Sequence, residues 1–308
     1  MDLNSDMDVD SCLYPSPGAV LVHHIESRAE RLELCEGLAL VHIGTCNQQT
    51  MRDRFPSFPA DAYGWCLEYS KEWSTSSQLR ETFTLIRLFR HGTVSFIANA
   101  RELQDGSWTE IRANLPLQYL PERPMYQLQE SDCAEFQCFC RQMWHNESWN
   151  SEWALTARAL FLQASSTGFS LGGTTREPWA LLRPLGYVMA LEAALIPERD
   201  FVGRRLRERA ICLLDPPEDD ASTVRRRIKD MYDIRSTIAH GSPISKKDLS
   251  SLKCNMPEFE KDVRSILCAA FRRVPAETGK RKEYLAKLYD VDDWHKLEAL
   301  ERVANGIK

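Results

Sequence analysis

Five amphipathic stretches fill the chain between residues 152 and 274, and only short connections separate them. In each stretch the apolar residues recur at steps of three and four positions, which places them on one face of a helix. Several helices joined by short loops are typical of an antiparallel bundle. The expected helices cover residues 152–164, 179–195, 202–214, 223–240 and 256–274, and residues 280–305 add one or two more.

The part of the chain that precedes these helices has a different pattern. Short apolar and β-branched runs predict strands at residues 19–23, 38–43, 83–89, 93–97 and 108–112, the third and fourth of which form a hairpin. Helices are expected at residues 26–36 and 78–81. The expected fold class is therefore α+β, with a small α+β or β-rich N-terminal module followed by a C-terminal all-α bundle.

Composition divides the chain into three segments. Residues 1–17 are acidic and rich in serine and proline, which predicts a flexible tail. Prolines between residues 116 and 124 interrupt regular structure and mark the approach to a domain boundary. We expect the N-terminal module to cover residues 18–130 and the helical bundle with its terminal extension to cover residues 131–308, beginning with a helix at 131–144.

The chain of 308 residues is 43% hydrophobic, enough to supply a sizeable core. It has neither a secretory apolar region at its start nor an apolar run near the ~18 residues that a membrane span needs, so we expect a cytoplasmic protein without membrane contact. In that compartment the ten cysteines are expected to be reduced thiols.

A guanidinium and an imidazole lie close together near the end of the fourth expected helix, where Arg235 and His240 precede Gly241. A guanidinium binds phosphate through forked hydrogen bonds, and an imidazole carries a proton near neutral pH. Five residues correspond to a rotation of ~140° around the helix, so the two side chains do not share a face. They converge on one phosphate only if the helix end distorts at Gly241 or if a second copy meets it across a two-fold axis.

The same residues also have a purely structural interpretation. A histidine in the last turn is favoured by the helix dipole, and a glycine after it is an ordinary left-handed C-cap. Arg235 would then pair with Asp230, with Asp233 or with a neighbouring helix. Both interpretations remain open at the level of the sequence.

Three segments in order, together with this motif, resemble the HEPN superfamily, and within it the Apea-like branch of prokaryotic defence proteins. They are Ala-Leu-Glu-Ala-Ala-Leu at 190–195, the basic helix at 204–210, and Tyr-x-x-Arg-Ser-x-Ile-x-His-Gly at 232–241. The resemblance covers roughly residues 150–275. It implies an all-α bundle that dimerises, in which the Arg and His of both copies line one cleft. Many such proteins are metal-independent ribonucleases, and active members often carry Asn, Asp or His where this chain has Ser236.

The resemblance and the chemistry together assign expected roles. Arg235 and His240 are the catalytic residues of a defence or toxin-like endoribonuclease, which needs no cofactor or metal. Ser236 and Asp233 orient the ring and the guanidinium, and Glu192 supports Arg235 from a neighbouring helix. The partner is RNA, with tRNA among the candidate substrates, and the N-terminal module is a sensor that binds an unidentified activator or inhibitor. The alternative is a non-catalytic HEPN-type module that binds RNA, nucleotide or protein, or that only dimerises.

Charge is distributed unevenly along a chain whose net charge is −5. Residues 1–175 carry 13 basic and 22 acidic residues, a net −9, whereas residues 176–308 carry 26 and 22, a net +4. Basic residues close to the motif are expected to attract RNA and to make its binding sensitive to salt. The alternative is that these are solvated helix faces, paired with Glu208, Asp230 and Asp233. The cations expected to bind RNA are Arg204, Arg205, Arg225, Arg226, Arg227 and Lys229.

A second cluster contains metal-ligand residue types. Cys133, Cys138, Cys140 and His145 lie within thirteen residues. However, Cys138 and Cys140 are ~200° apart on a helix, and no second cysteine pair follows at the spacing of a zinc ribbon or finger. We therefore expect no metal site, and the cysteines are assigned to packing.

Overall fold

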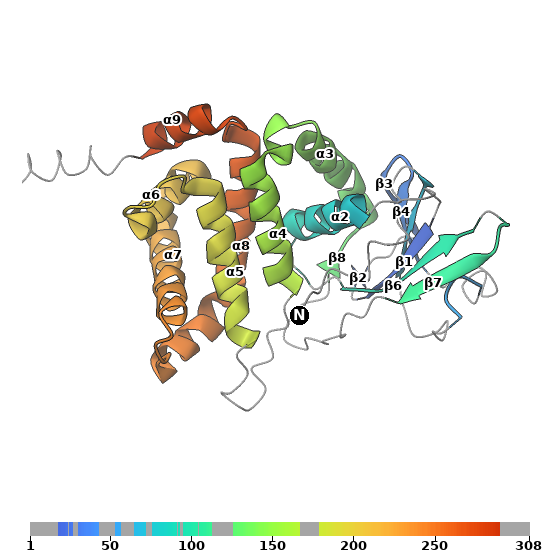
Figure 1. Ribbon diagram of the computed structural model, residues 1–308, viewed down its shortest axis with the longest axis horizontal. Coiled ribbons are helices and arrows are strands. Elements are labelled where there is room, and N and C mark those ends of the chain that lie inside the picture. Colours follow the sequence, from blue (N-terminus) through green and yellow to red (C-terminus); the bar gives the residue numbers. More distant parts are fainter. Residues whose placement is uncertain are drawn as a thin grey trace, which may run out of the picture. The chain divides into compact units, whose positions relative to one another are not determined.

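The structure is a computed structural model whose chain divides into two compact units, Met1–Arg141 and Gln142–Lys308 (Figure 1). Strands lie in the first unit and the second is helical, so the α+β class is as expected. The division between the units lies after residue 141, whereas the sequence predicts it after residue 130. The structure describes residues 18–23, 25–26, 30–42, 53–56, 65–71, 76–90, 92, 95–103, 105–112, 126–166 and 179–289. The expected tail, the prolines at 116–124 and the end of the terminal extension lie outside these ranges.

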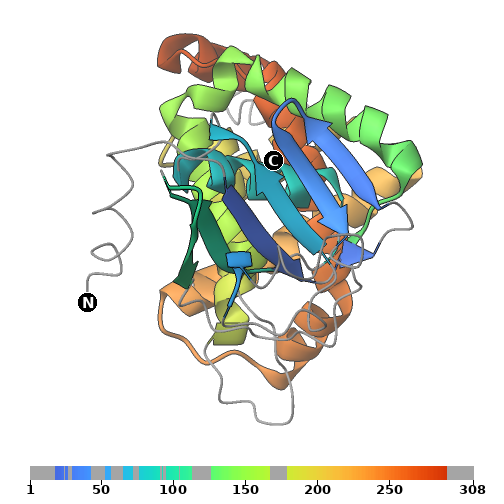
Figure 2. The same cartoon turned by 90° about the vertical axis from the view of Figure 1, so that its right-hand side faces the viewer.

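A six-stranded antiparallel sheet forms the first unit, with strand order β3-β4-β5-β1-β6-β7 (Figure 2). Tyr69 of β5 pairs with Gly18 of β1 and with Leu38 of β4, which fixes the register at the centre of the sheet. A short parallel pair, β2 (Ile25–Glu26) and β8 (Tyr126–Gln127), lies outside this sheet. The sheet strands are β1 (Gly18–His23), β3 (Arg31–Cys35), β4 (Leu38–His42), β5 (Trp65–Tyr69), β6 (Ser95–Glu102) and β7 (Trp108–Arg112).

Two expected elements of this unit are wrong. The expected strand at 83–89 is the second half of helix α2 (Ser76–Phe89), so the hairpin with 93–97 does not form. Every residue from Thr82 to Leu88 is buried, and a short run that is buried on all sides does not distinguish a strand from a helix. The expected helix at 26–36 contains β3 instead, in which Leu32 and Leu34 are buried while Arg31 and Glu33 are exposed.

Helix α3 (Cys133–Trp144) begins close to its expected start and contacts α2. The Phe89 ring lies 5.0 Å from that of Phe136 and 5.6 Å from that of Phe139, measured between centroids. Arg90, just after α2, forms an ion pair with Asp132 at 2.6 Å. These contacts explain why most of α3 belongs to the first unit.

The second unit is a bundle of antiparallel and crossing helices, in which α5 packs against α4, α6, α7 and α8. A Cβ atom on Gly186 of α5 would lie 2.8 Å from that of Ala164, so α4 and α5 approach each other closely. Helices α5 and α6 have the bounds expected from the sequence. The bundle contains α4 (Glu152–Ser166), α5 (Trp179–Leu195), α6 (Val202–Leu214), α7 (Glu218–Ala239), α8 (Lys246–Arg273) and α9 (Thr278–Leu288).

Helix α8 begins ten residues before its expected start at 256. Ser245 caps it, because its hydroxyl oxygen accepts a hydrogen bond from the Asp248 amide at 3.1 Å. Pro257 consequently lies inside the helix, not in its first turn. Helix α7 likewise begins at Glu218, five residues before the expected position, directly after Pro217.

A buried arginine connects three helices of this unit. Arg209 on α6 is fully buried and donates to both carboxylate oxygens of Glu198, at 2.7 and 2.9 Å. It also donates to the carbonyl oxygens of Leu195, at the end of α5, and of Leu285, in the last turn of α9. Because guanidinium has five donors and no acceptor, one side chain satisfies several helix-end carbonyl groups at once.

None of the helices within the described residues is long and apolar enough to cross a membrane.

Candidate functional site

The end of α7 carries the motif that the sequence singled out. Helix α7 ends at Ala239, His240 is its C-cap, and Gly241 follows in the left-handed conformation with φ of 67°. The Gly241 amide donates to the Ile238 carbonyl and the Ser242 amide donates to the Thr237 carbonyl, both at 3.0 Å. These two hydrogen bonds make a Schellman motif, so the glycine C-cap is present as expected.

Arg235 lies on the side of α7 that faces the bundle. At 100° per residue it is within ~40° of Ile228 and Met231, which are both fully buried. Its Nη2 atom donates to Oε2 of Glu192 on α5 at 3.0 Å, and its Cζ lies 6.0 Å from the centre of the Tyr232 ring. The contact from Glu192 on a neighbouring helix is therefore the one that the sequence suggested.

The Arg235–Glu192 pair is half-buried and joined at a single point. The side chains are 27% and 18% exposed, while Nε of Arg235 and Oε1 of Glu192 are buried without a hydrogen-bond partner. Burial raises the pKa of Glu192 above its ordinary value of 4.5, and the positive charge of Arg235 opposes this shift. Because the contact joins one guanidinium nitrogen to one carboxylate oxygen, the pair is not forked.

His240 is exposed at the C-cap, on a different side of the helix from Arg235. No hydrogen bond or ion pair of the described residues joins the two side chains. Within one copy they therefore diverge, as the helical spacing predicts, and Gly241 ends the helix without distorting the preceding turn.

The side chains of Asp233 and Ser236, which were expected to orient the guanidinium and the imidazole, do not contact these groups. The Asp233 carboxylate pairs with Lys229 at 2.7 Å, one turn earlier on the exposed side of α7, and does not reach Arg235. Ser236 contacts His240 through its backbone, where the His240 amide donates to the Ser236 carbonyl at 3.1 Å. Neither side chain orients the imidazole or the guanidinium in this structure.

At least three of the six cations that were expected to bind RNA have carboxylate partners. Arg225 donates to both oxygens of Glu208 at 3.0 to 3.1 Å, and Arg227 donates to both oxygens of Asp262 at 2.7 and 2.9 Å. Lys229 pairs with Asp233, and Arg205 donates to the Asp200 carbonyl at 2.9 Å. Arg226 is exposed and Arg204 is half-buried. The positive potential of this surface is therefore lower than the sequence suggests.

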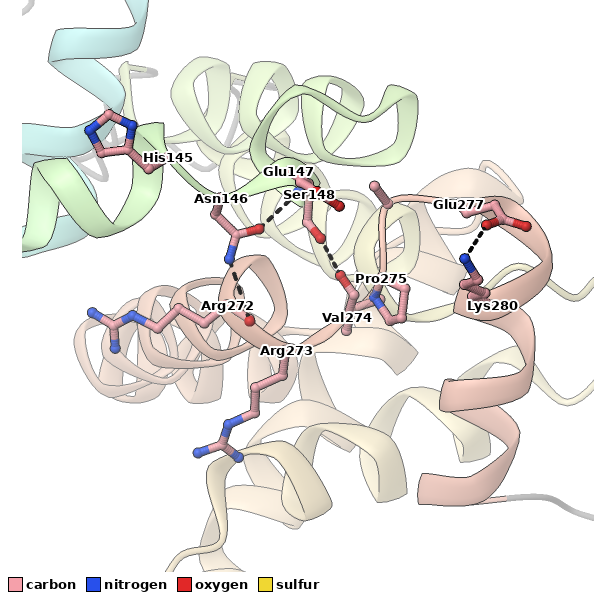
Figure 3. Close-up of a pocket in the computed structure, with 11 residues that line it drawn as sticks. His145, Asn146, Glu147, Ser148, Arg272, Arg273, Val274, Pro275, Glu277 and Lys280 are labelled. Carbon is pink, nitrogen blue, oxygen red and sulfur yellow. Dashed lines mark hydrogen bonds and ion pairs between the residues drawn. The ribbon is translucent and has the colours of Figure 1, made fainter.

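A groove of about 480 Å³ lies in the same unit, where sequence reasoning placed no site (Figure 3). It is bounded by the turn at residues 145–148 and by the connection between α8 and α9. Four of the residues that border it are basic, namely His145, Arg272, Arg273 and Lys280. In the sequence, the Arg272-Arg273 pair is the one feature that could have indicated this groove. His145 and Lys280 are too distant along the chain to be grouped with it.

The cysteine cluster does not form a metal site in the described part of the chain. No group of three or more His, Cys, Asp or Glu side chains there has the arrangement that would hold a metal ion. Cys140 is buried in α3, Cys138 is exposed, and Cys133 is partly exposed with its thiol 3.8 Å from the Gln129 carbonyl.

Comparison of the chain with protein-family models, with curated proteins and with solved structures finds no match in any of the three. The resemblance to the HEPN superfamily therefore rests on Arg235, His240 and the segments around them.

Proposed function

We propose that the helical unit is a metal-independent RNA endonuclease of the HEPN type, acting as a defence or toxin-like effector. The observation that carries this proposal is the placement of Arg235 and His240 at one helix end. Glu192 holds the guanidinium on the inner side of α7, while the imidazole is exposed beyond the last turn. Since the two groups of one copy diverge, a single phosphate meets both only in a cleft built from two copies.

The reaction uses the RNA itself as the nucleophile. The ribose 2′-oxygen attacks the adjacent phosphorus, and the bond from phosphorus to the 5′-oxygen breaks, leaving a 2′,3′-cyclic phosphate and a 5′-hydroxyl. His240 accepts the proton of the 2′-hydroxyl or delivers one to the leaving 5′-oxygen. Arg235 stabilises the charge that develops on the phosphorane oxygens. DNA lacks the 2′-hydroxyl and is not cut.

The N-terminal sheet unit acts in this proposal as a sensor or targeting part that restrains cleavage until an activator or inhibitor binds or leaves. Its α2 and α3 helices pack together through phenylalanine rings. That packing gives the unit a core of its own, as a separately folded sensor requires.

The second candidate function is a non-catalytic HEPN-type module that binds RNA, nucleotide or a protein, or that only dimerises. Two observations favour it. Ser236 stands where active relatives of this motif often have Asn, Asp or His, and its side chain does not contact His240. In addition, Arg225 and Arg227 each hold a carboxylate through forked hydrogen bonds instead of facing solvent alone.

Cleavage of end-labelled single-stranded RNA and of bulk tRNA in EDTA distinguishes these functions. The proteins are the wild type, Arg235→Ala and His240→Ala, with Arg199→Ala, an exposed arginine of the α5–α6 loop, as the matched control. The mass of each protein is measured in solution. We expect the wild type and Arg199→Ala to cut RNA and the other two variants, still dimeric, to be inactive.

Mixing the two inactive variants tests whether the cleft is composite. Each mixed dimer contains one intact Arg235 and one intact His240, so an equimolar mixture recovers part of the cleavage. Equal cleavage by all four proteins, or none by any, would contradict the endonuclease and favour the binding module. A mixture that stays inactive would contradict the shared cleft.

A further inference from the structure

The groove between the 145–148 turn and the start of α9 has a positively charged lining. Arg272 and Arg273 leave the end of α8 on one side of the connecting loop, while Glu277 and Lys280 lie on the other, at the start of α9 (Figure 3). His145 and Glu147 lie at the turn that borders the groove. The lining therefore has three permanent positive charges and one histidine against two carboxylates.

The floor of this groove is held in place by hydrogen bonds. Asn146 donates through Nδ2 to the Arg272 carbonyl at 3.4 Å, and the Ser148 hydroxyl donates to the Val274 carbonyl. These bonds satisfy carbonyl groups at the C-terminal end of α8, where the helix dipole is negative. These bonds fix the backbone around the groove. They also reduce the negative potential of the carbonyl groups at the end of α8 in the absence of ligand.

The cations of the groove differ in how firmly they are held. Arg273 donates through Nη1 to the Leu213 carbonyl at 2.9 Å, which anchors it to the end of α6. Lys280 pairs with Glu277 at 2.7 Å, but the two side chains are 71% and 64% exposed. A pair so exposed contributes little, so Lys280 can exchange Glu277 for a phosphate at small cost. Arg272 is exposed at the rim.

The cations of the groove are held differently from those of α7, where the sequence predicts RNA binding. Arg225 and Arg227 on α7 each face a carboxylate through two hydrogen bonds, and such forked pairs are strong and compete with phosphate. We infer that the groove lined by Arg272, Arg273 and Lys280, not the face of Arg225 and Arg227, binds the phosphate backbone of an RNA strand. This inference rests on the proposed endonuclease and adds where its substrate is held away from the cut phosphate.

The placement of the cations favours an extended polyanion over a single phosphate. Arg272 and Lys280 lie on opposite sides of the connecting loop, so different phosphates of one strand contact them. The described residues that line the groove include no Phe, Tyr or Trp. Base stacking is therefore absent there, and the contact reads the backbone independently of sequence.

Fluorescence anisotropy with a labelled, fully 2′-O-methylated RNA of 20 nucleotides tests this inference. Because that RNA lacks a free 2′-hydroxyl, binding is measured without cleavage. The test variant is Arg272→Gln/Lys280→Gln, and Lys246→Gln/Lys247→Gln on the exposed start of α8 removes the same charge elsewhere. We expect the groove variant to lose about tenfold in affinity, and its plot of log K against log salt to become about 1.4 units shallower for two lost phosphate contacts.

The charge-conserving variant Arg272→Lys/Lys280→Arg should keep most of the affinity, which separates lost charge from misfolding. An equal loss in the groove and control variants, or no loss in the groove variant, would overturn the inference. So would displacement of the RNA by pyrophosphate at equal phosphate concentration, since that identifies a small-anion site. These outcomes leave the endonuclease to be judged on ordinary RNA with the Arg235 and His240 variants.

Discussion

Arg235 on α7 donates through Nη2 to Oε2 of Glu192 on α5 at 3.0 Å, across 43 residues of sequence. The contact is half-buried and leaves one polar atom of each partner without a hydrogen bond. It fixes the direction in which the guanidinium leaves α7, and that direction differs from the one taken by His240. The contact between Arg235 and Glu192 therefore affects both the stability of the bundle and the geometry of the proposed cleft.

The raised pKa of Glu192 predicts a pH-dependent contribution to stability. An acid whose folded-state pKa lies above its ordinary value of 4.5 binds its proton more readily when folded. Its favourable contribution is complete below pH 4.5 and is lost as the pH rises through the higher folded value. We expect the unfolding free energy of the wild type, relative to Glu192→Gln, to fall as the pH rises above 4.5 in urea titrations.

The same titrations on Glu283→Gln provide the control. Glu283 pairs with Lys287 on the exposed side of α9, and this lysine lowers the pKa of the carboxyl. The pH dependence of this variant should have the opposite sign. A wild-type advantage over Glu192→Gln that grows with pH would contradict the burial of the Glu192 carboxyl.

The Schellman motif predicts that function and stability separate at the end of α7. His240→Ala removes an exposed side chain and should change the unfolding free energy by no more than about 0.5 kcal/mol. Gly241→Ala places a Cβ in the left-handed conformation, where no other atom lies within 4 Å, and should cost about 1 kcal/mol through backbone strain alone. Urea unfolding at pH 8 measures both. A large loss for His240→Ala would assign that histidine a structural role.

The sequence predicts the helical unit better than the sheet unit, for physical reasons. Trp179–Leu195 and Val202–Leu214 match their expected bounds, because their apolar positions have helical spacing and Asp215, Pro216 and Pro217 end the second helix clearly. The sequence predicts a strand at residues 83–89, where the structure has a helix, because a segment buried on all sides lacks the periodicity that identifies a helix. Strand β5 (Trp65–Tyr69) was missed entirely, although its pairing partners were expected as strands.

The candidate site was predictable where it depends on local spacing and unpredictable where it depends on distant partners. The divergence of Arg235 from His240 and the glycine C-cap follow from helical geometry. By contrast, the pairing of Arg227 with Asp262 crosses 35 residues and removes a cation that the sequence assigned to RNA. The groove at Lys280 likewise depends on a turn more than 130 residues earlier in the chain, which no local pattern connects to it.

The buried hub at Arg209 predicts a large loss of stability when its guanidinium is removed. Arg209→Ala leaves the Glu198 carboxylate and the Leu195 and Leu285 carbonyl groups without their donor. Breaking a buried ion pair from one side costs about 3–5 kcal/mol. Arg207→Ala, on the same helix but less buried, should stay within about 0.5 kcal/mol. Equal effects of the two substitutions in urea unfolding would show that the hub contributes no more than an ordinary surface arginine.

Gly203 and Gly279 are each the second residue of their helix, α6 and α9, but they have very different surroundings. A Cβ on Gly203 of α6 would lie 2.7 Å from Cε1 of Tyr232, whose ring is next to the Arg235 guanidinium, whereas a Cβ on Gly279 of α9 would meet only Glu277 Oε1 at 3.9 Å. Gly279→Ala should therefore stabilise the protein by about 0.5–1 kcal/mol through helix propensity.

Gly203→Ala should instead cost about 1–3 kcal/mol, because the Tyr232 ring must move. The same displacement shifts Arg235, so RNA cleavage should fall with Gly203→Ala and stay unchanged with Gly279→Ala. Thermal unfolding and cleavage rates on both variants test this. A Gly203→Ala protein that is stabilised like Gly279→Ala and cuts RNA at the wild-type rate would show that Tyr232 does not hold Arg235 in place.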